Sequence, residues 1–195
     1  MKVNLKIDSR DLLALRRQAA GWQKRVQSSQ GTLVHFLVEE FGRQYCEAIV
    51  SGMGVVPHTG GTTVLAPVQG LQASATYHAL SDMTVEKKDD RKWNLNIWMA
   101  SGETARAVRT HKAKVAARRV TVFSGILGGG KDQEALEKAI QSEFGFEHPD
   151  IEEHWEGRPL FTVLNDLLLQ HRETIYENIR RAVIQDALAA GWGRT

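Results

Sequence analysis

VTVFSGILGGGKDQEALEKAI, from Val120 to Ile140, reads as a strand, a glycine-rich loop and a helix, and it decides the fold class of the chain. The segment from Gly125 to Asp132 matches a Walker A phosphate loop except at its last position. Such a loop wraps phosphates with backbone N–H groups, reaches them with a lysine and holds magnesium with a Ser or Thr hydroxyl. A true phosphate loop would predict a nucleotide-binding enzyme built on a parallel sheet.

The residues around the loop argue against nucleotide binding. Asp132 stands where the hydroxyl is needed and would place a carboxylate beside the incoming phosphates. After Lys131 the chain offers a short helix, an acidic loop and a long terminal helix, without the further parallel strands that such enzymes need. We therefore interpret the glycines as a flexible turn, in which Asp132 caps a helix from Gln133 to Phe144.

Helical periodicity marks both ends of the chain. An amphipathic helix is expected to end near Val26, and a second to begin at Thr32 and run past Ile49. The strongest helical pattern follows Arg158 and continues to Gly191, with His171 on its apolar side as a core or interface histidine. The N-terminal stripe consists of Leu12, Leu15, Ala19, Trp22 and Val26.

The intervening segments favour strands and extended connections. Residues 3–7 alternate as a short strand, and residues 51–70 are rich in Gly, Thr and Pro and have no helical period. Residues 77–88 and 93–99 are expected to form an antiparallel hairpin. The sequence thus predicts one α+β domain over residues 1–195. It has an N-terminal helical region, a small antiparallel sheet, a long C-terminal amphipathic helix, and extended loops at about 51–70 and 103–131.

Composition points to an ordinary folded protein. Of 195 residues, 42% are hydrophobic, and a chain of this length can form a stable hydrophobic core without disulfide bonds. The single cysteine, Cys46, forms no internal disulfide and is expected to be a small buried apolar residue. We find no apolar run that resembles a signal peptide or could span a membrane, which favours a cytosolic product.

Charge is unevenly distributed, although 25 Lys and Arg nearly balance 23 Asp and Glu. A basic segment, called here the basic arm, precedes an acidic segment, called the acidic loop. A contact between the two in neighbouring subunits, a DNA-facing role for the basic arm, and plain solvated surface remain open. The basic arm comprises Arg106, Arg109, Lys112, Lys114, Arg118 and Arg119, and the acidic loop Glu147, Asp150, Glu152, Glu153 and Glu156.

No pattern of residues predicts catalysis, a cofactor or a bound metal. A set of potential metal ligands lies close together, but its spacing resembles no zinc signature, and a solvated acidic loop is the expected structure: His148, Asp150, Glu152, Glu153 and His154. No nucleophile motif occurs either. A small metal-dependent hydrolase would need an ion at these two histidines, and we expect instead that the protein is not an enzyme.

Taken in order, these elements resemble the tail-completion, or neck, proteins of long-tailed bacteriophages, the group that includes the minor tail protein Z of phage lambda. The resemblance spans most of the chain. It rests on a Pro-x-x-Thr-Gly segment, a Glu-Phe-Gly turn and an Arg-Pro-Phe-type motif before the last helix. Here Leu160 separates the proline from the phenylalanine, and residues 106–131 form an insertion. The matching positions are Pro57, Thr59 and Gly60; Glu143, Phe144 and Gly145; and Arg158, Pro159 and Phe161.

The resemblance implies a structural virion protein without catalysis. Such proteins are made in the host cytoplasm and assemble as rings, often hexamers, that join the tail tube or tail terminator to the head connector. Copies of the chain itself and these particle proteins would be its partners, with packaged DNA near the basic arm. The alternative is a nucleic-acid-binding module that uses residues 106–119.

Overall fold

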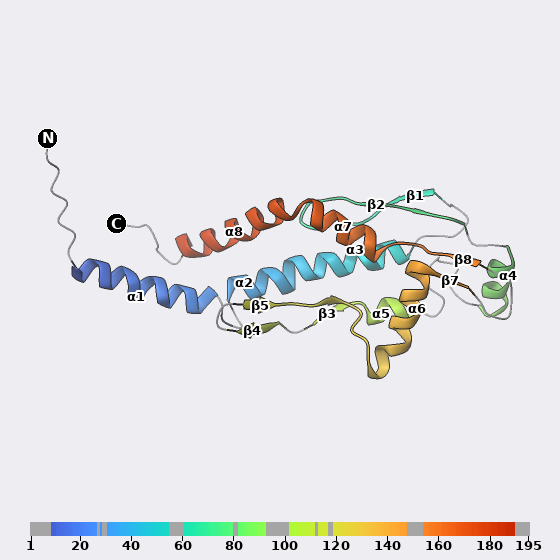
Figure 1. Cartoon of the computed structure of the whole chain (residues 1–195), viewed down its shortest axis with the longest axis horizontal. Helices are drawn as coiled ribbons and strands as arrows, with labels where there is room; N and C mark the ends of the chain where they lie inside the picture. Colours follow the sequence, from blue (N-terminus) through green and yellow to red (C-terminus); the bar gives the residue numbers. More distant parts are fainter. Residues whose placement is uncertain are drawn as a thin grey trace.

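A computed structural model describes residues 9–26, 28, 31–54, 61–79, 82–92, 102–111, 113–116, 119–147 and 154–189. It confirms the α+β class: helices dominate, and the strands pair in small antiparallel ladders. The molecule is elongated, with a helical spine along its middle; α7, α8, β1 and β2 lie on one side of it, and β3, β4, β5, α5 and α6 on the other (Figure 1).

The spine is one helical run with a wider turn inside it. It begins at Thr32 as expected, and comprises α2 (Thr32–His35), a π-helical segment η1 (Phe36–Gly42) and α3 (Arg43–Met53). The last part, α3, buries Tyr45, Ala48, Ile49 and Met53 against the rest of the molecule. The expected second helix is therefore confirmed.

Gly42, at the end of the π-helical segment, lets a strand ladder approach the spine. The ladder pairs β3 (Arg109–Thr110) with β6 (Ser124–Gly125) in antiparallel register. A Cβ atom on Gly42 would lie 2.7 Å from Thr110 Oγ1 and 2.8 Å from Ser124 Oγ. A π-helical turn is a local irregularity of a helix, and here it ends at the residue where the β3–β6 ladder comes close to the spine.

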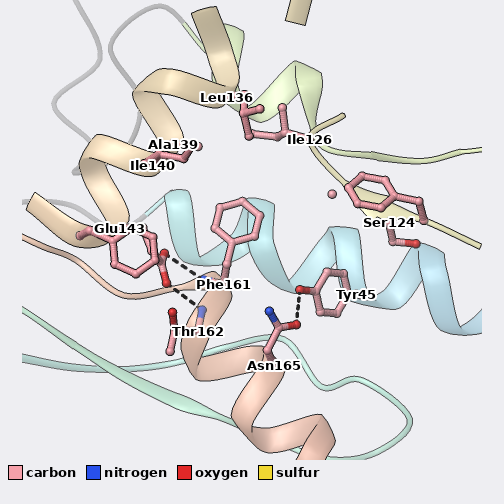
Figure 2. A pocket seen from close by; sticks show the side chains of 13 residues that line it. Tyr45, Ser124, Ile126, Leu136, Ala139, Ile140, Glu143, Phe161, Thr162 and Asn165 are labelled. Carbon is pink, nitrogen blue, oxygen red and sulfur yellow. Dashed lines mark hydrogen bonds between the residues drawn. The ribbon is translucent and has the colours of Figure 1, made fainter. Parts of the chain in front are cut away.

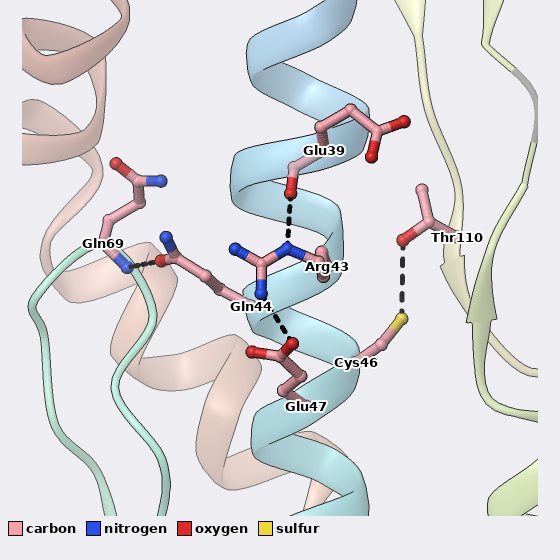
Figure 3. Close-up of polar contacts among 7 residues, drawn as sticks. All are labelled: Glu39, Arg43, Gln44, Cys46, Glu47, Gln69 and Thr110. Atoms are coloured by element: carbon pink, nitrogen blue, oxygen red, sulfur yellow. Dashed lines mark hydrogen bonds and ion pairs between the residues drawn. The ribbon is translucent and has the colours of Figure 1, made fainter.

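Two contacts on α3 fix its neighbours (Figure 3). Cys46 is half-buried, and its Sγ lies 3.5 Å from Thr110 Oγ1, which lies 3.1 Å from Ser124 Oγ. Burial raises the pKa of the Cys46 thiol. On another side, Gln44 Oε1 accepts the backbone N–H of Gln69 at 2.6 Å, at a turn where Gln69 has a positive φ of 53°.

The C-terminal helical layer consists of two helices rather than the single long helix expected. α7 (Phe161–Gln170) ends at His171, and α8 (Arg172–Ala189) begins one residue later. His171 has φ −106° and ψ 21°, outside the α region, and its side chain is exposed, so it is not a core histidine, and the interface role expected as the other possibility stays a prediction. Residues 190–195, where Gly191 was expected to end the helix, lie outside the described residues.

Two further ladders occur among the described strands, and the second of them contacts α6. β1 (Gly61–Val64) pairs with β2 (Ser74–Tyr77), and β7 (Gly145–Glu147) with β8 (His154–Glu156). The first pair means that residues 51–70 are not one extended connection.

The hairpin expected from residues 77–88 and 93–99 is wrong in its first strand. α4 (Asp82–Asp90) occupies that segment, with an acidic first turn and lysines in the last turn, an arrangement that complements the helix dipole. Residues 93–99 and the strand expected at 3–7 lie outside the described part of the chain.

The segment 103–131, expected as an extended loop, contains helices and strands in its described part. It holds α5 (Glu103–Ala107), the β3–β6 ladder, and a hairpin of β4 (Lys114–Ala116) with β5 (Arg119–Thr121). The glycine-rich turn then leads through η3 (Gly130–Asp132) into α6.

The core lies where α3 meets β1, β2, α6 and α7. Its largest fully buried side chains lose nearly all contact with water, and each such side chain contributes about 1.5–3 kcal/mol through burial. They are Ile49, Met53, Leu65, Leu160, Leu164 and Val68.

The first helix, α1 (Ser9–Val26), stands away from this core (Figure 1). Leu12, Leu13 and Leu15 are 52–53% exposed, whereas Val26 at the other end is buried. Arg25 Nη2 donates to Asp186 Oδ2 of α8 at 2.8 Å, which ties the end of α1 to the body. The predicted helix is confirmed, and its apolar stripe is exposed at Leu12 and Leu15 but partly or fully covered from Ala19 to Val26.

Replacement of Gly42 by alanine is expected to lower the free energy of unfolding by about 1–3 kcal/mol, because Thr110 and Ser124 must move away from the new methyl group. Urea denaturation followed by circular dichroism measures this. Gly21→Ala is the matched control: its Cβ meets nothing within 4 Å, and alanine favours a helix by up to about 1 kcal/mol. Equal stabilities for the two variants would contradict the close approach at Gly42.

Candidate assembly groove

A buried glutamate joins the end of one helix to the start of another. Glu143 lies in the last turn of α6 (Gln133–Phe144) and is 5% exposed. Its Oε2 accepts the N–H groups of Leu160 at 2.8 Å and Phe161 at 3.1 Å, and its Oε1 accepts that of Thr162 at 2.7 Å. These are N–H groups at the start of α7, which the helix itself leaves unpaired. Glu143 therefore caps α7 from another helix (Figure 2).

The structure thus brings together two of the segments that carry the phage resemblance. Glu143 and Phe161 meet at the α6–α7 joint, and Gly145, with φ 75° and ψ 176°, turns the chain between them. Phe144 is 73% exposed, while Arg158 and Pro159 are half-buried just before α7. The remaining motif positions, at 57, 59 and 60, lie outside the described residues.

The capping role of Glu143 was missed in the sequence, although a signal was present. Ala135, Ala139 and Glu143 recur at four-residue spacing and form the buried face of α6. A carboxylate on such a face needs hydrogen-bond donors, because a buried polar group without them is costly.

The hydrogen bonds of the glycine-rich turn before α6 differ from the predicted ones. Asp132 occupies the N-cap position but makes no capping hydrogen bond; its carboxylate pairs with Arg109 instead. Gln133 Oε1 accepts the N–H of Gly129 at 3.0 Å. The cap predicted for Asp132 is wrong because the arginine of β3 lies within reach and a charged pair is the stronger partner.

An apolar groove begins beside the Glu143 cap. Its first pocket, of about 390 Å³, lies between α6, α7 and the region of β6, with walls that include Ile126, Leu136, Ile140 and Phe161 (Figure 2).

A second pocket, of about 430 Å³, continues from the first along η1 and β5, where Leu37, Phe41 and Leu168 line it. The two pockets share Tyr45, Phe123, Ser124 and Asn165 and so form one groove.

The groove contains few polar groups. Tyr45 Oη donates to Asn165 Oδ1 at 2.9 Å where the two pockets meet. Burial, with smaller contributions from Cys46 and Glu143, raises the pKa of Tyr45 to about 12, so the hydroxyl keeps its proton at neutral pH. A groove whose walls are mostly apolar, with this hydrogen-bonded pair at its centre, is suited to bind apolar side chains.

A second polar cluster lies on the other side of Glu143. Burial and the nearby Glu143 carboxylate raise the pKa of Tyr77 to about 12. Lys88 of α4 is 8% exposed, and burial together with the Arg158 guanidinium lowers its pKa to about 8. The α6–α7 joint is therefore surrounded by groups that burial keeps neutral or partly neutral.

The basic arm does not form one surface in the described chain. Arg106 lies in α5 and Arg109 in β3, where it is engaged with Asp132. Lys114 and Arg119 are exposed on the β4–β5 hairpin. Lys112 and Arg118 lie outside the described residues.

The acidic loop is described only at its ends. Glu147 falls in β7 and Glu156 in β8, strands that pair in antiparallel register. Asp150, Glu152 and Glu153 lie outside the described residues, as does His148 of the metal-ligand set considered above, and the side chain of His154 is not described. Elsewhere in the described chain, no three His, Cys, Asp or Glu side chains group as a metal site.

No family model, no curated protein and no solved structure matches this chain. Among the helices that the structure describes, none is long and apolar enough to cross a membrane. The function must therefore be argued from the surface itself.

Glu143→Gln is expected to lower the free energy of unfolding by about 2–3 kcal/mol, because the amide N–H₂ would face N–H donors of α7 in place of a charged acceptor. Glu137→Gln, at an exposed position of the same helix, is expected to stay within about 0.5 kcal/mol. Chemical denaturation measures both. A loss no larger than that of the control would show that the cap contributes nothing to stability.

Lys88 gives a pH-dependent prediction. Its pKa is about 8 in the folded chain against the ordinary 10.5, so between these values the unfolded chain binds more protons and rising pH favours folding. Relative to Lys88→Met, the native chain should gain stability as pH rises from 8 to 10. Unfolding curves at several pH values test this, with the exposed Lys87→Met as control. A constant difference between Lys88→Met and the native chain across that range would refute it.

Proposed function

We propose that this protein is a structural, self-assembling subunit that forms a ring at the tail end or head–tail junction of a long-tailed phage. The carrying observation is the exposed helix α1, whose Leu12, Leu13 and Leu15 are more than half exposed. A row of leucines open to water is unfavourable on an isolated molecule and becomes favourable when another protein surface covers it. An assembled ring provides that cover.

The position in a phage particle rests on the resemblance described in the sequence. Two of its motif segments, around Glu143 and Phe161, meet at the α6–α7 joint, which also forms one wall of the groove. A shared motif that builds an assembly surface is what a family of ring-forming proteins would retain. In this proposal the chain needs no catalysis, cofactor or metal, and its partners are copies of itself, the tail tube or terminator, and the head connector.

The DNA-binding alternative draws on Lys114 and Arg119, which lie exposed on the β4–β5 hairpin. A two-stranded ribbon with basic side chains is a form that can contact phosphates. Yet Arg109 of the same arm is neutralised by Asp132. The alternative requires duplex affinity that falls steeply with salt and is lost in the double variant Lys114→Glu/Arg119→Glu.

Tail joining provides the direct test. Purified protein is added to phage tails that lack their completion protein, and tail ends are imaged by electron microscopy. We expect ring-shaped density at one end of each tail with the native chain and with Lys114→Glu, and none with Leu12→Glu/Leu15→Glu, because charge on α1 blocks assembly. Tails that stay bare with the native chain, or a native chain that binds duplex DNA instead, would overturn the proposal.

A further inference from the structure

We infer that the apolar groove between α6, α7 and the spine receives helix α1 of a second copy of this chain. This inference deepens the proposed function, on which it rests for the idea that copies assemble. It assigns the two halves of the joint: a protruding amphipathic helix on one copy, and a groove on the next.

The groove is open and apolar at its mouth. Ile140 is 49% exposed, Phe144 73% and Phe123 44%, and all three lie on its rim or walls. The Tyr45–Asn165 hydrogen bond satisfies the polar pair where the pockets meet. An amphipathic helix that lays its apolar face into such a groove is a recurrent mode of recognition.

Helix α1 has the matching shape. Leu12 and Leu15 lie three residues apart on one exposed face, whereas Trp22 and Val26 at the other end of the helix are covered by the body of the same chain. The exposed N-terminal half of α1 therefore presents an apolar face that can enter a groove on another copy.

Charge complementarity selects this occupant. α1 contains five cations and one acid, a net charge of +4. The elements that surround the groove, η1, α3, β5, β6, α6 and α7, together contain seven acids and three cations, a net charge of −4, and these charges lie mostly outside the lining itself, in which only Glu143 and Arg119 are charged. Opposite fields of this kind steer association and fix its orientation.

A helix cannot reach the groove of its own chain. α1 joins the body at the α2 end of the spine, where Arg25 contacts Asp186, and from there its N-terminal half extends away from α6 and α7, which line the groove (Figure 1). The joint is therefore between two copies, and it uses a different surface on each. A joint of this heterologous kind repeats head to tail and closes into a ring when the rotation allows.

Site-specific cross-linking tests the joint in the full chain. With Cys46 replaced by serine, a copy carrying Leu15→Cys is mixed with a differently tagged copy carrying Phe144→Cys, and a short bis-maleimide is added. We expect a cross-linked pair, and none when Phe144→Cys is replaced by Tyr176→Cys, an equally exposed position on α8. Cross-linking equal to that of the control pair, or absent in both, overturns the inference.

Complementation gives a second readout. Leu12→Glu/Leu15→Glu has a disabled helix and Ile140→Glu a disabled groove, so each alone should remain monomeric in light scattering. A mixture retains one intact joint and should stop at a mass of two chains. A mixture that stays monomeric, or either variant assembling by itself, also overturns the inference.

The two proposals can fail separately. If the cross-link and the two-chain complex form but the native chain never attaches to tails, the joint stands and the phage function is wrong. If the chain joins tails as a ring without the cross-link, the function stands and the joint lies elsewhere.

Discussion

The carboxylate of Glu143 is the constraint on which the rest of the structure depends. It replaces the missing partners of three N–H groups at the start of α7 and thereby fixes the angle at which α7 leaves α6. That angle places Leu160 and Leu164 in the core and Phe161 in the wall of the groove. Core packing and the wall of the groove therefore depend on the same contact.

Close approach of backbones provides the second constraint. Gly42 allows the β3–β6 ladder to lie against the spine, and Gly52 has the side chains of Leu160 and Leu65 within 3 Å of a would-be Cβ. The groove is formed where this ladder, the spine and the α6–α7 joint meet.

The sequence predicted the fold class and the major helices, since their apolar periodicity is strong at Thr32–Met53 and in the C-terminal region. It did not predict the break at His171, because the apolar stripe runs through that residue without interruption. It failed at Asp82–Asp90, where mixed apolar and charged residues were taken for a strand. The groove could not be predicted at all, since its lining side chains come from segments more than 100 residues apart, such as Phe41 and Leu168.

The ion pair between Arg25 and Asp186 carries a consequence for the direction of the protruding helix. Arg25, with smaller contributions from Thr32 and Trp22, holds the pKa of the Asp186 carboxyl below its usual range. The carboxylate therefore remains charged in mildly acidic solution where an ordinary aspartate begins to take up protons. The ion pair that ties the end of α1 to α8 is therefore retained under mild acidification.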